Sequence, residues 1–202
     1  MSIGTTVPLD RFSNSPAILY NRKRYFLKSA TVQKGLNMAE TIPFPQGNRK
    51  KNLKADIFDN YTKAKGLNFF KRRDVHDSYD TSVFMTAIPA GKHHKLVAAV
   101  ITDNSMYILL RVHLGTAPKG PARKTFMAFL NHLNAHHAIM KYVVGSDDNV
   151  FLDVTTTTRA EKFDPEVVRI TLDMIIYHLG EVYDDIARRL DKPGDETNGF
   201  SL

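Results

Sequence analysis

Two histidines four positions apart, His132 and His136, have the spacing that most directly suggests chemistry. On a helix this spacing places both imidazoles on one face, where they could share a metal ion. A zinc-binding helix of the His-Glu-x-x-His type also carries a glutamate, and no carboxylate accompanies these two histidines. The alternative is that His136 and His137 end a helix, because partial positive charge suits its last turn. We favour this second interpretation and predict no metal site.

Two further polar clusters are better explained as turns. His93 and His94 lie between Lys92 and Lys95, in a connection between predicted strands that solvent would surround. Asp147-Asp148 resembles part of a calcium loop but lacks the Asp-x-Asp-x-Asp-Gly spacing. A hairpin turn accounts for both aspartates.

The carboxylates of the C-terminal region are candidates for a general acid or base. Asp173, Glu181, Asp184 and Asp185 mostly fall off the apolar stripe of the helix predicted there, so they would face solvent. Acid–base catalysis needs a carboxyl group in a desolvated cleft beside a reacting group. The chain also lacks cysteine, which excludes disulfides, thiolate zinc sites and thiol catalysis. We therefore predict no catalytic residue, no metal, no cofactor and no enzyme activity.

Residues Gly115–Gly120 form the best candidate for an anion site. They precede a predicted helix, together with Lys119 and Arg123-Lys124, and a helix N-terminus presents free amide groups. The Gly-x-x-x-x-Gly-Lys-Ser/Thr motif is missing, which argues against a nucleotide-binding loop. An incidental phosphate or an acidic partner remains the alternative to a plain loop.

The N-terminal residues carry the whole net positive charge of the chain. Residues 1–54 hold ten basic and two acidic residues, whereas the remainder holds 18 basic and 19 acidic residues. Basic side chains neutralise phosphates, and aromatic side chains between them can stack on unpaired bases. The same composition also suits an acidic protein surface, and a solvated tail needs no partner at all. The candidate partner-binding residues are Arg22, Lys23, Arg24, Tyr25, Phe26, Phe44, Arg49, Lys50 and Lys51.

No helical or strand period runs through residues 1–54, and four prolines interrupt them. Such a segment cannot offset its own ordering entropy, so we predict an extended arm. Apolar triplets such as Ile42-Pro43-Phe44 could anchor this arm on a surface. The predicted organisation is an arm over 1–54, a domain over 55–190 and a flexible tail over 191–202.

Periodicity locates the elements that would position these residues. Consecutive β-prone runs flanked by helices, rather than strict alternation, indicate an α+β domain with an antiparallel sheet. We expect five or six strands, with the helices at 125–139 and 164–190 on one face. The expected helices are Ala55–Lys65, 125–139 and 164–190, and the expected strands are Leu67–Arg72, Thr81–Ile88, Leu96–Ile101, Met106–Val112, Tyr142–Val144 and Val150–Val154.

The last helix has the clearest signals. Asp164 suits an N-cap, Pro165 suits the first turn, and Glu166 suits the positive end of the helix dipole. Apolar residues then recur at spacings of four and three from Val168 to Ile186. We expect Pro193-Gly194 to stop the helix.

The sequence around the second helix reads Leu130-Asn131-x-x-Asn134, followed by Lys141-Tyr142, Asp147–Val154 and Phe163-Asp164. This sequence pattern, together with the order of the predicted elements, resembles that of the YbjN-like family, which shares the type III secretion chaperone-like fold. The resemblance covers residues 55–190 and implies helices against one face of an antiparallel sheet. It also implies a non-enzymatic binding role, often as a homodimer that holds an extended segment of another protein. The basic arm is additional to the family pattern.

These features predict a protein-binding, chaperone-like adaptor or assembly subunit whose basic arm docks into a larger complex. Its partners would be other protein subunits, and it could form a homo-oligomer. The alternative is a nucleic-acid-associated protein whose arm contacts phosphates. No run of about 18 apolar residues exists, so we expect no membrane contact. The absence of a secretory signal and of cysteine suits a cytoplasmic protein.

Overall fold

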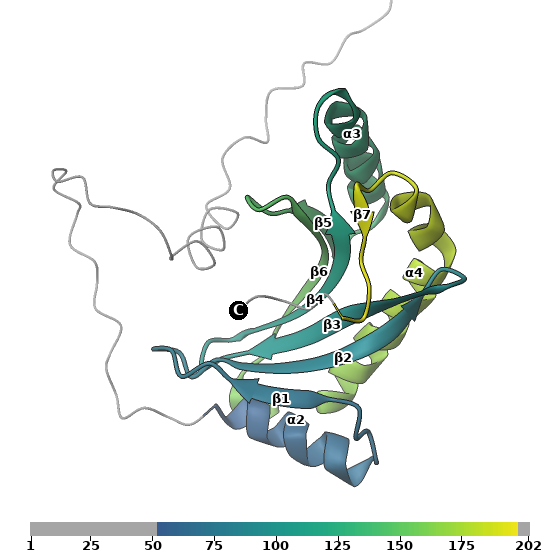
Figure 1. Cartoon of the computed structure of the whole chain (residues 1–202). Helices are drawn as coiled ribbons and strands as arrows, with labels where there is room; N and C mark the ends of the chain where they lie inside the picture. The colour runs from purple at the N-terminus through teal and green to yellow at the C-terminus, as the bar shows by residue number, and fades with distance from the viewer. Residues whose placement is uncertain (1–51, 198–202) are drawn as a thin grey trace, which may run out of the picture. The chain divides into compact units, whose positions relative to one another are not determined.

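The computed structural model describes residues 52–197, and nearly all of the predicted arm lies outside this part. The described residues form three α-helices and a seven-stranded sheet (Figure 1). The helices are α2 (Leu53–Ala64), α3 (Pro121–His136) and α4 (Pro165–Ala187), with a short 3-10 helix η1 (Ala160–Lys162). The strands are β1 (Lys71–Asp74), β2 (Ser82–Ala90), β3 (His94–Thr102), β4 (Tyr107–Thr116), β5 (Met140–Val144), β6 (Asn149–Thr157) and β7 (Lys192–Pro193).

The sheet is antiparallel throughout, in the order β1-β2-β3-β4-β6-β5. The predicted antiparallel pairing of β3 with β4 is confirmed, with Val100 opposite Leu110. β6 pairs with both β5 and β4, which joins the second predicted hairpin to the first group of strands. The two-residue β7 adds to the end of β4. The predicted α+β class and antiparallel sheet are therefore confirmed, with β7 as an additional strand.

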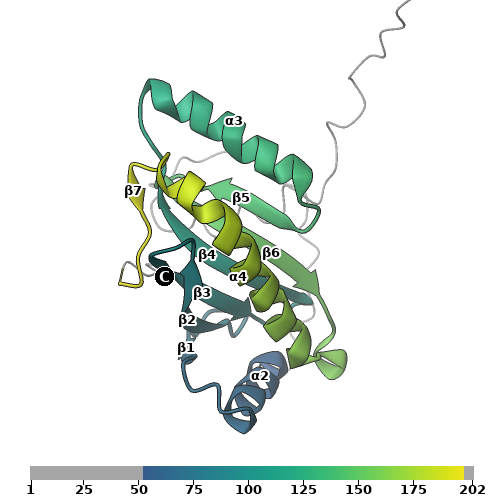
Figure 2. The ribbon, with the colours of Figure 1, turned by 90° about the vertical axis from the view of Figure 1, so that its right-hand side faces the viewer.

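The helices α3 and α4 lie on the same face of the sheet, as predicted (Figure 2). α4 crosses the sheet and packs on β2 and β4, while α3 packs beside β5. α2 contacts η1 and α4, and Tyr61 of α2 donates a hydrogen bond of 2.5 Å to Glu166 in the first turn of α4. This arrangement turns one side of α4 to the core and leaves the other side facing outward.

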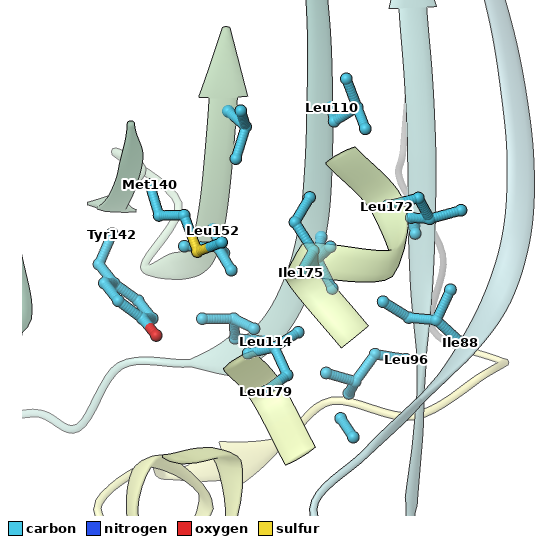
Figure 3. Close-up of a cluster of buried hydrophobic side chains, with 14 of the residues drawn as sticks. Ile88, Leu96, Leu110, Leu114, Met140, Tyr142, Leu152, Leu172, Ile175 and Leu179 are labelled. Carbon is cyan, nitrogen blue, oxygen red and sulfur yellow. The ribbon is translucent and has the colours of Figure 1, made fainter. Parts of the chain in front are cut away.

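The core lies between α4 and the sheet. Every second residue of β4 from Ile108 to Leu114 is fully buried, as expected for a strand with one face on a core. Leu172, Ile175 and Leu179 of α4 interleave with strand residues that include Leu110 (Figure 3). Burying each of these aliphatic side chains stabilises the fold by about 1.5–3 kcal/mol. The predicted apolar stripe of α4 thus faces the core.

Three boundaries near the first two helices differ from the predictions. β1 begins at Lys71 rather than at Leu67, because the Leu67 amide still bonds the Thr62 carbonyl and closes the end of α2. α3 begins at Pro121 rather than at 125, since proline lacks only an amide that the first turn leaves free. α3 ends at His136 rather than at 139.

The segment after α4 also differs from the prediction. α4 ends at Ala187 rather than at 190, and Pro193 belongs to a strand instead of stopping the helix. The hydroxyl of Tyr183 donates to the Leu114 carbonyl at 2.7 Å and accepts from the Gly194 amide at 3.0 Å. Together with backbone bonds from the Asp191 and Gly194 amides to the Thr116 and Leu114 carbonyls, these two bonds hold β7 beside β4. The start of the predicted C-terminal tail therefore contains a paired strand.

Candidate interaction surface

Four exposed apolar side chains form one row on the outward side of α4. The exposed fractions are 46% for Val167, 47% for Ile170, 43% for Met174 and 72% for Tyr177. At 3.6 residues per turn these positions lie opposite the side of α4 that faces the core. Within residues 52–197, no element lies over this side of the helix (Figure 2). We call Val167, Ile170, Met174 and Tyr177 the α4 row.

The two apolar sides of α4 set it apart from an ordinary surface helix, which has one apolar stripe and an opposite polar side. The spacings within the α4 row are three, four and three, the repeat along which helices pair in a coiled coil. A helix with this pattern is suited to pack on both sides. The core occupies one side, and the α4 row is the other.

Charged side chains border the α4 row. Arg169 donates to Glu166 at 2.6 Å and to Asp173 at 2.5 Å. The hydrogen bond from Arg169 lowers the pKa of Glu166, and the bond from Tyr61 adds to this effect. At the other end of the row, a hydrogen bond to Glu181 raises the pKa of Tyr177. The polar groups beside the row are thus held in place by one another.

The charge of α4 differs from that of its surroundings. The helix contains five acidic residues and one basic residue, which gives a net charge of −4. Residues 52–197 together contain 19 basic and 19 acidic residues and are neutral. The negative charge on α4 is therefore a local excess, and the apolar row lies within it.

The outer edge of β5 is closed by a side chain of α3. The Asn134 carboxamide accepts from the Tyr142 amide at 2.7 Å and donates to the Tyr142 carbonyl at 3.1 Å. It therefore occupies the backbone groups that a neighbouring strand would use at the centre of β5. The Lys141 ammonium adds bonds to the carbonyls of Asn134 and His137 at 3.0 and 2.8 Å. Occupied edges of this kind resist pairing with another strand.

The opposite edge of the sheet is protected by charge. β1 has four residues, of which three are basic and one is acidic. Arg72 forms ion pairs with Asp56 at 3.1 Å and with Asp74 at 2.9 Å. Short, charged edge strands are a common defence against strand addition. Among the described elements, the α4 row is thus better suited to receive a partner than either terminal strand of the sheet.

A buried histidine joins α4 to β5 and α3. His178 is 7% exposed, and a hydrogen bond of 2.6 Å joins its Nε2 to the Tyr142 hydroxyl. The His137 ring lies 4.3 Å from the His178 ring, centroid to centroid. Burial lowers the pKa of His178, and the neighbouring His137 lowers it further. Burial and the neighbouring His137 thus disfavour the charged form of His178 at this junction.

A polar cavity of about 250 Å³ lies beside the β1–β2 loop. Asn52, Arg72, Asp74, His76, Asp80, Thr81 and Ser82 line it. Asp74 accepts from Ser82 at 2.7 Å, and this bond is the main cause of the lowered pKa of Asp74. The Asn52 carboxamide donates to the carbonyls of Asp80 and Thr102. These bonds hold the loop against the start of α2, which is a structural use of the polar groups.

Comparison with known proteins adds one structural similarity. No protein-family model matches this chain, and no curated protein is significantly similar to it. One chain in the structure of the heterodimeric ExoU–SpcU complex, from the type III secretion system of Pseudomonas aeruginosa, shares 15% sequence identity with this chain. The match covers 66% of this chain and 97% of that one, with a TM-score of 0.40.

His132 and His136 lie together on α3, as their spacing predicts. Their rings are 4.3 Å apart, centroid to centroid, and Nδ1 of His136 donates to the His132 carbonyl. Within residues 52–197, no three His, Asp or Glu side chains are grouped as a metal ion would require. Every helix in this range is also too short or too polar to cross a bilayer.

The other candidate residues have structural contacts. Arg123, in the candidate anion site, forms an ion pair of 2.7 Å with Asp148 in the β5–β6 turn. Asp147 accepts from the Asn149 amide in the same turn, as expected for a hairpin. Asp184 accepts from the Lys92 amide in the β2–β3 turn. The predicted partner-binding residues Arg22, Lys23, Arg24, Tyr25, Phe26, Phe44, Arg49, Lys50 and Lys51 lie outside the described residues.

The α4 row is the feature that the sequence analysis missed. The apolar periodicity was assigned to the core stripe alone, although a second set of apolar residues at spacings of three and four runs along the same helix. Two stripes on one helix are a readable signal. Which of them faces the core depends on where the sheet lies.

Proposed function

We propose that this protein is a YbjN-like, chaperone-like binding module that acts without catalysis in the cytoplasm, as an adaptor or assembly subunit. The observation that carries this proposal is the α4 row, an apolar surface on a helix whose opposite side already forms the core. Contiguous exposed apolar side chains with a polar border are characteristic of protein-binding surfaces. The implied role in the YbjN-like family supports the same function.

The state of the polar groups agrees with binding rather than catalysis. An active site brings together ionisable groups with perturbed pKa values and leaves them free to act on a substrate. In the described cavity, Arg72 and Asp74 bond each other, and Asp74 also bonds Ser82. Their contacts serve the β1–β2 loop.

The test is affinity capture with a matched control. A row variant carries Ile170→Ser and Met174→Ser, and a control variant carries Ile139→Ser and Met106→Ser. The control residues have the same types and similar exposure, 52% and 51%, but lie in the connections before β5 and before β4. Tagged full-length chains are expressed in the native cell, and co-purified proteins are quantified by mass spectrometry.

We expect wild type and control variant to retain the same partner proteins and the row variant to lose most of them. Truncating well-packed anchor residues of an interface typically costs 1–2 kcal/mol or more each, on the order of tenfold in affinity. Equal partner sets for all three chains would refute binding through α4.

The basic arm supports a second candidate function, contact with nucleic acid. Residues 1–54 carry eight net positive charges in a chain whose remainder is close to neutral. If the arm binds phosphates, affinity for a labelled oligonucleotide falls steeply with salt. Replacing Arg49, Lys50 and Lys51 by Ala would then flatten the slope of log K against log salt by about 2–3 units. A shallow salt dependence, unchanged by this substitution, leaves an acidic protein surface as the partner of the arm.

A further inference from the structure

The α4 row has a spacing, a chemistry and a charged border that together specify the kind of partner. Resting on the proposed protein-binding function, we infer that the α4 row seats one amphipathic helix of a partner protein. The apolar stripe of that helix packs on the row, and basic residues flank the stripe.

The spacing of the row fits a helix. From Val167 to Tyr177 the row spans eleven residues, and the ten steps between them cover about 15 Å along the axis of α4. Its alternation of three and four residues presents a straight ridge to a second helix that crosses at a shallow angle. Two to three turns of a partner helix with the same repeat would cover the row completely.

The chemistry of the row disfavours an extended segment. Val167, Ile170 and Met174 offer no strong hydrogen-bond donor or acceptor, and the backbone of α4 is engaged within the helix. An extended chain laid on them would bury its own amides and carbonyls without partners, which is costly. A helix satisfies its backbone internally and buries only side chains. The edges of β1 and β5, where an extended chain could pair, are charged or occupied.

The border of the row selects a basic helix. Glu166, Arg169 and Asp173 run along one side of the row with a net charge of −1, and Glu181 follows Tyr177 on the outward side. Opposite charges at the edge of a helix pair steer association and choose the partner. A second copy of α4 would instead bring the carboxylates of Glu166, Asp173 and Glu181 against the same set. The charge therefore favours a basic partner over self-association through this surface.

Designed peptides test this inference directly. Three labelled 21-residue probes share leucine at the a and d positions of a heptad. The first has lysine at e and g, and the second has glutamate at these positions. The third is the first sequence with two central residues replaced by proline, which prevents a helix. Binding to the full-length chain is followed by fluorescence anisotropy, with the row and control variants described above. Because the basic arm attracts the acidic probe independently of α4, only binding that the row variant weakens is attributed to the row.

We expect the basic helical probe to bind at least about tenfold more tightly than the proline probe. The row variant should weaken it about tenfold or more, and the control variant should leave it unchanged. A charge variant with Asp173→Lys and Glu181→Lys should weaken the basic probe and strengthen the row-dependent binding of the acidic one. Circular dichroism of all variants should match the wild type, because each substituted side chain is exposed or half-exposed.

Different results would overturn the helical form and the basic charge of the proposed partner. Equal, row-dependent binding of the helical and proline probes would overturn the helical partner. A row-dependent preference for the acidic probe would overturn the basic one. If no probe responds to the row variant, the inference fails. The proposed function still stands in that case if the same row variant loses its protein partners in the affinity capture.

Discussion

Asn134, Tyr142 and His178 form one connected set of contacts at the level of single residues. Asn134 bonds both backbone groups of Tyr142, and the Tyr142 hydroxyl shares a hydrogen bond with His178. Asn134 and Tyr142 belong to the sequence pattern on which the resemblance to the YbjN-like family rests. These two residues of the pattern therefore have a structural role, because they join α3 to the outer strand β5 and link both elements to α4.

Replacing Asn134 by Ala should lower the free energy of unfolding by about 1–3 kcal/mol, because two partly buried backbone groups lose their partners. Asn131→Ala is the matched control, since Asn131 lies exposed on the same helix. It should change stability by at most about 0.5 kcal/mol. Urea unfolding of both variants measures the difference. Equal stabilities would show that the bonds from Asn134 contribute nothing.

His178 should make stability depend on pH. Burial, together with His137, lowers the pKa of His178 in the folded chain, while Glu181 opposes this effect. Below about pH 6.5 the unfolded chain then binds more protons than the folded chain, so stability falls as the pH decreases. His178→Gln keeps a polar side chain without this titration and should lose less stability between pH 7.5 and pH 5.0 than the wild type. Chemical unfolding at both pH values gives the two differences, and identical losses would contradict the account.

Most helices and strands could be predicted from the sequence, whereas some of the contacts between them could not. The order of helices and strands was predictable, because apolar residues repeat every two or every 3.6 positions within each element. The role of Lys54 was not predictable. It is 1% exposed, and its ammonium donates to the carbonyls of Ser105 and Tyr107, about 50 residues away in the sequence. Contacts of this kind depend on the assembled sheet and leave no local pattern. The α4 row differs from this case, because its apolar spacing can be read from the sequence. Only the choice of which stripe faces the core depends on the assembled sheet.

The Tyr183 hydroxyl supplements the backbone hydrogen bonds that join β7 to β4, among them one of 2.8 Å from the Gly194 amide to the Leu114 carbonyl. Tyr183→Phe removes the bonds to the Leu114 carbonyl and from the Gly194 amide. It should cost about 1–3 kcal/mol and speed hydrogen exchange of the Gly194 amide, while amides of β2 and β3 keep their protection. Tyr177→Phe removes an exposed hydroxyl from the same helix and serves as the control. Unchanged exchange at Gly194 would mean that β7 is held by other contacts.

The first described helix, α2, begins at Leu53, two residues before the predicted helix start at Ala55. The Asn52 side chain caps α2 by accepting from the Ala55 amide, and Lys54 is buried against the β3–β4 turn. A chain of residues 52–197 should therefore unfold in one cooperative transition. A chain that begins at residue 55 should be less stable by at least about 1 kcal/mol, the usual contribution of an N-cap. Thermal unfolding compares the two, and equal midpoints would refute this role of residues 52–54.

The central claim for the whole molecule is that a partner protein docks on the outward side of α4. Site-specific photo-crosslinking in the native cell tests it most directly, with benzoylphenylalanine in place of Tyr177 or, as a control, in place of Phe69. Both residues are aromatic and exposed, at 72% and 56%. We expect a discrete crosslinked partner from position 177, joined through a basic amphipathic segment, and none from position 69. No crosslink at position 177, or the same products from both positions, would contradict it.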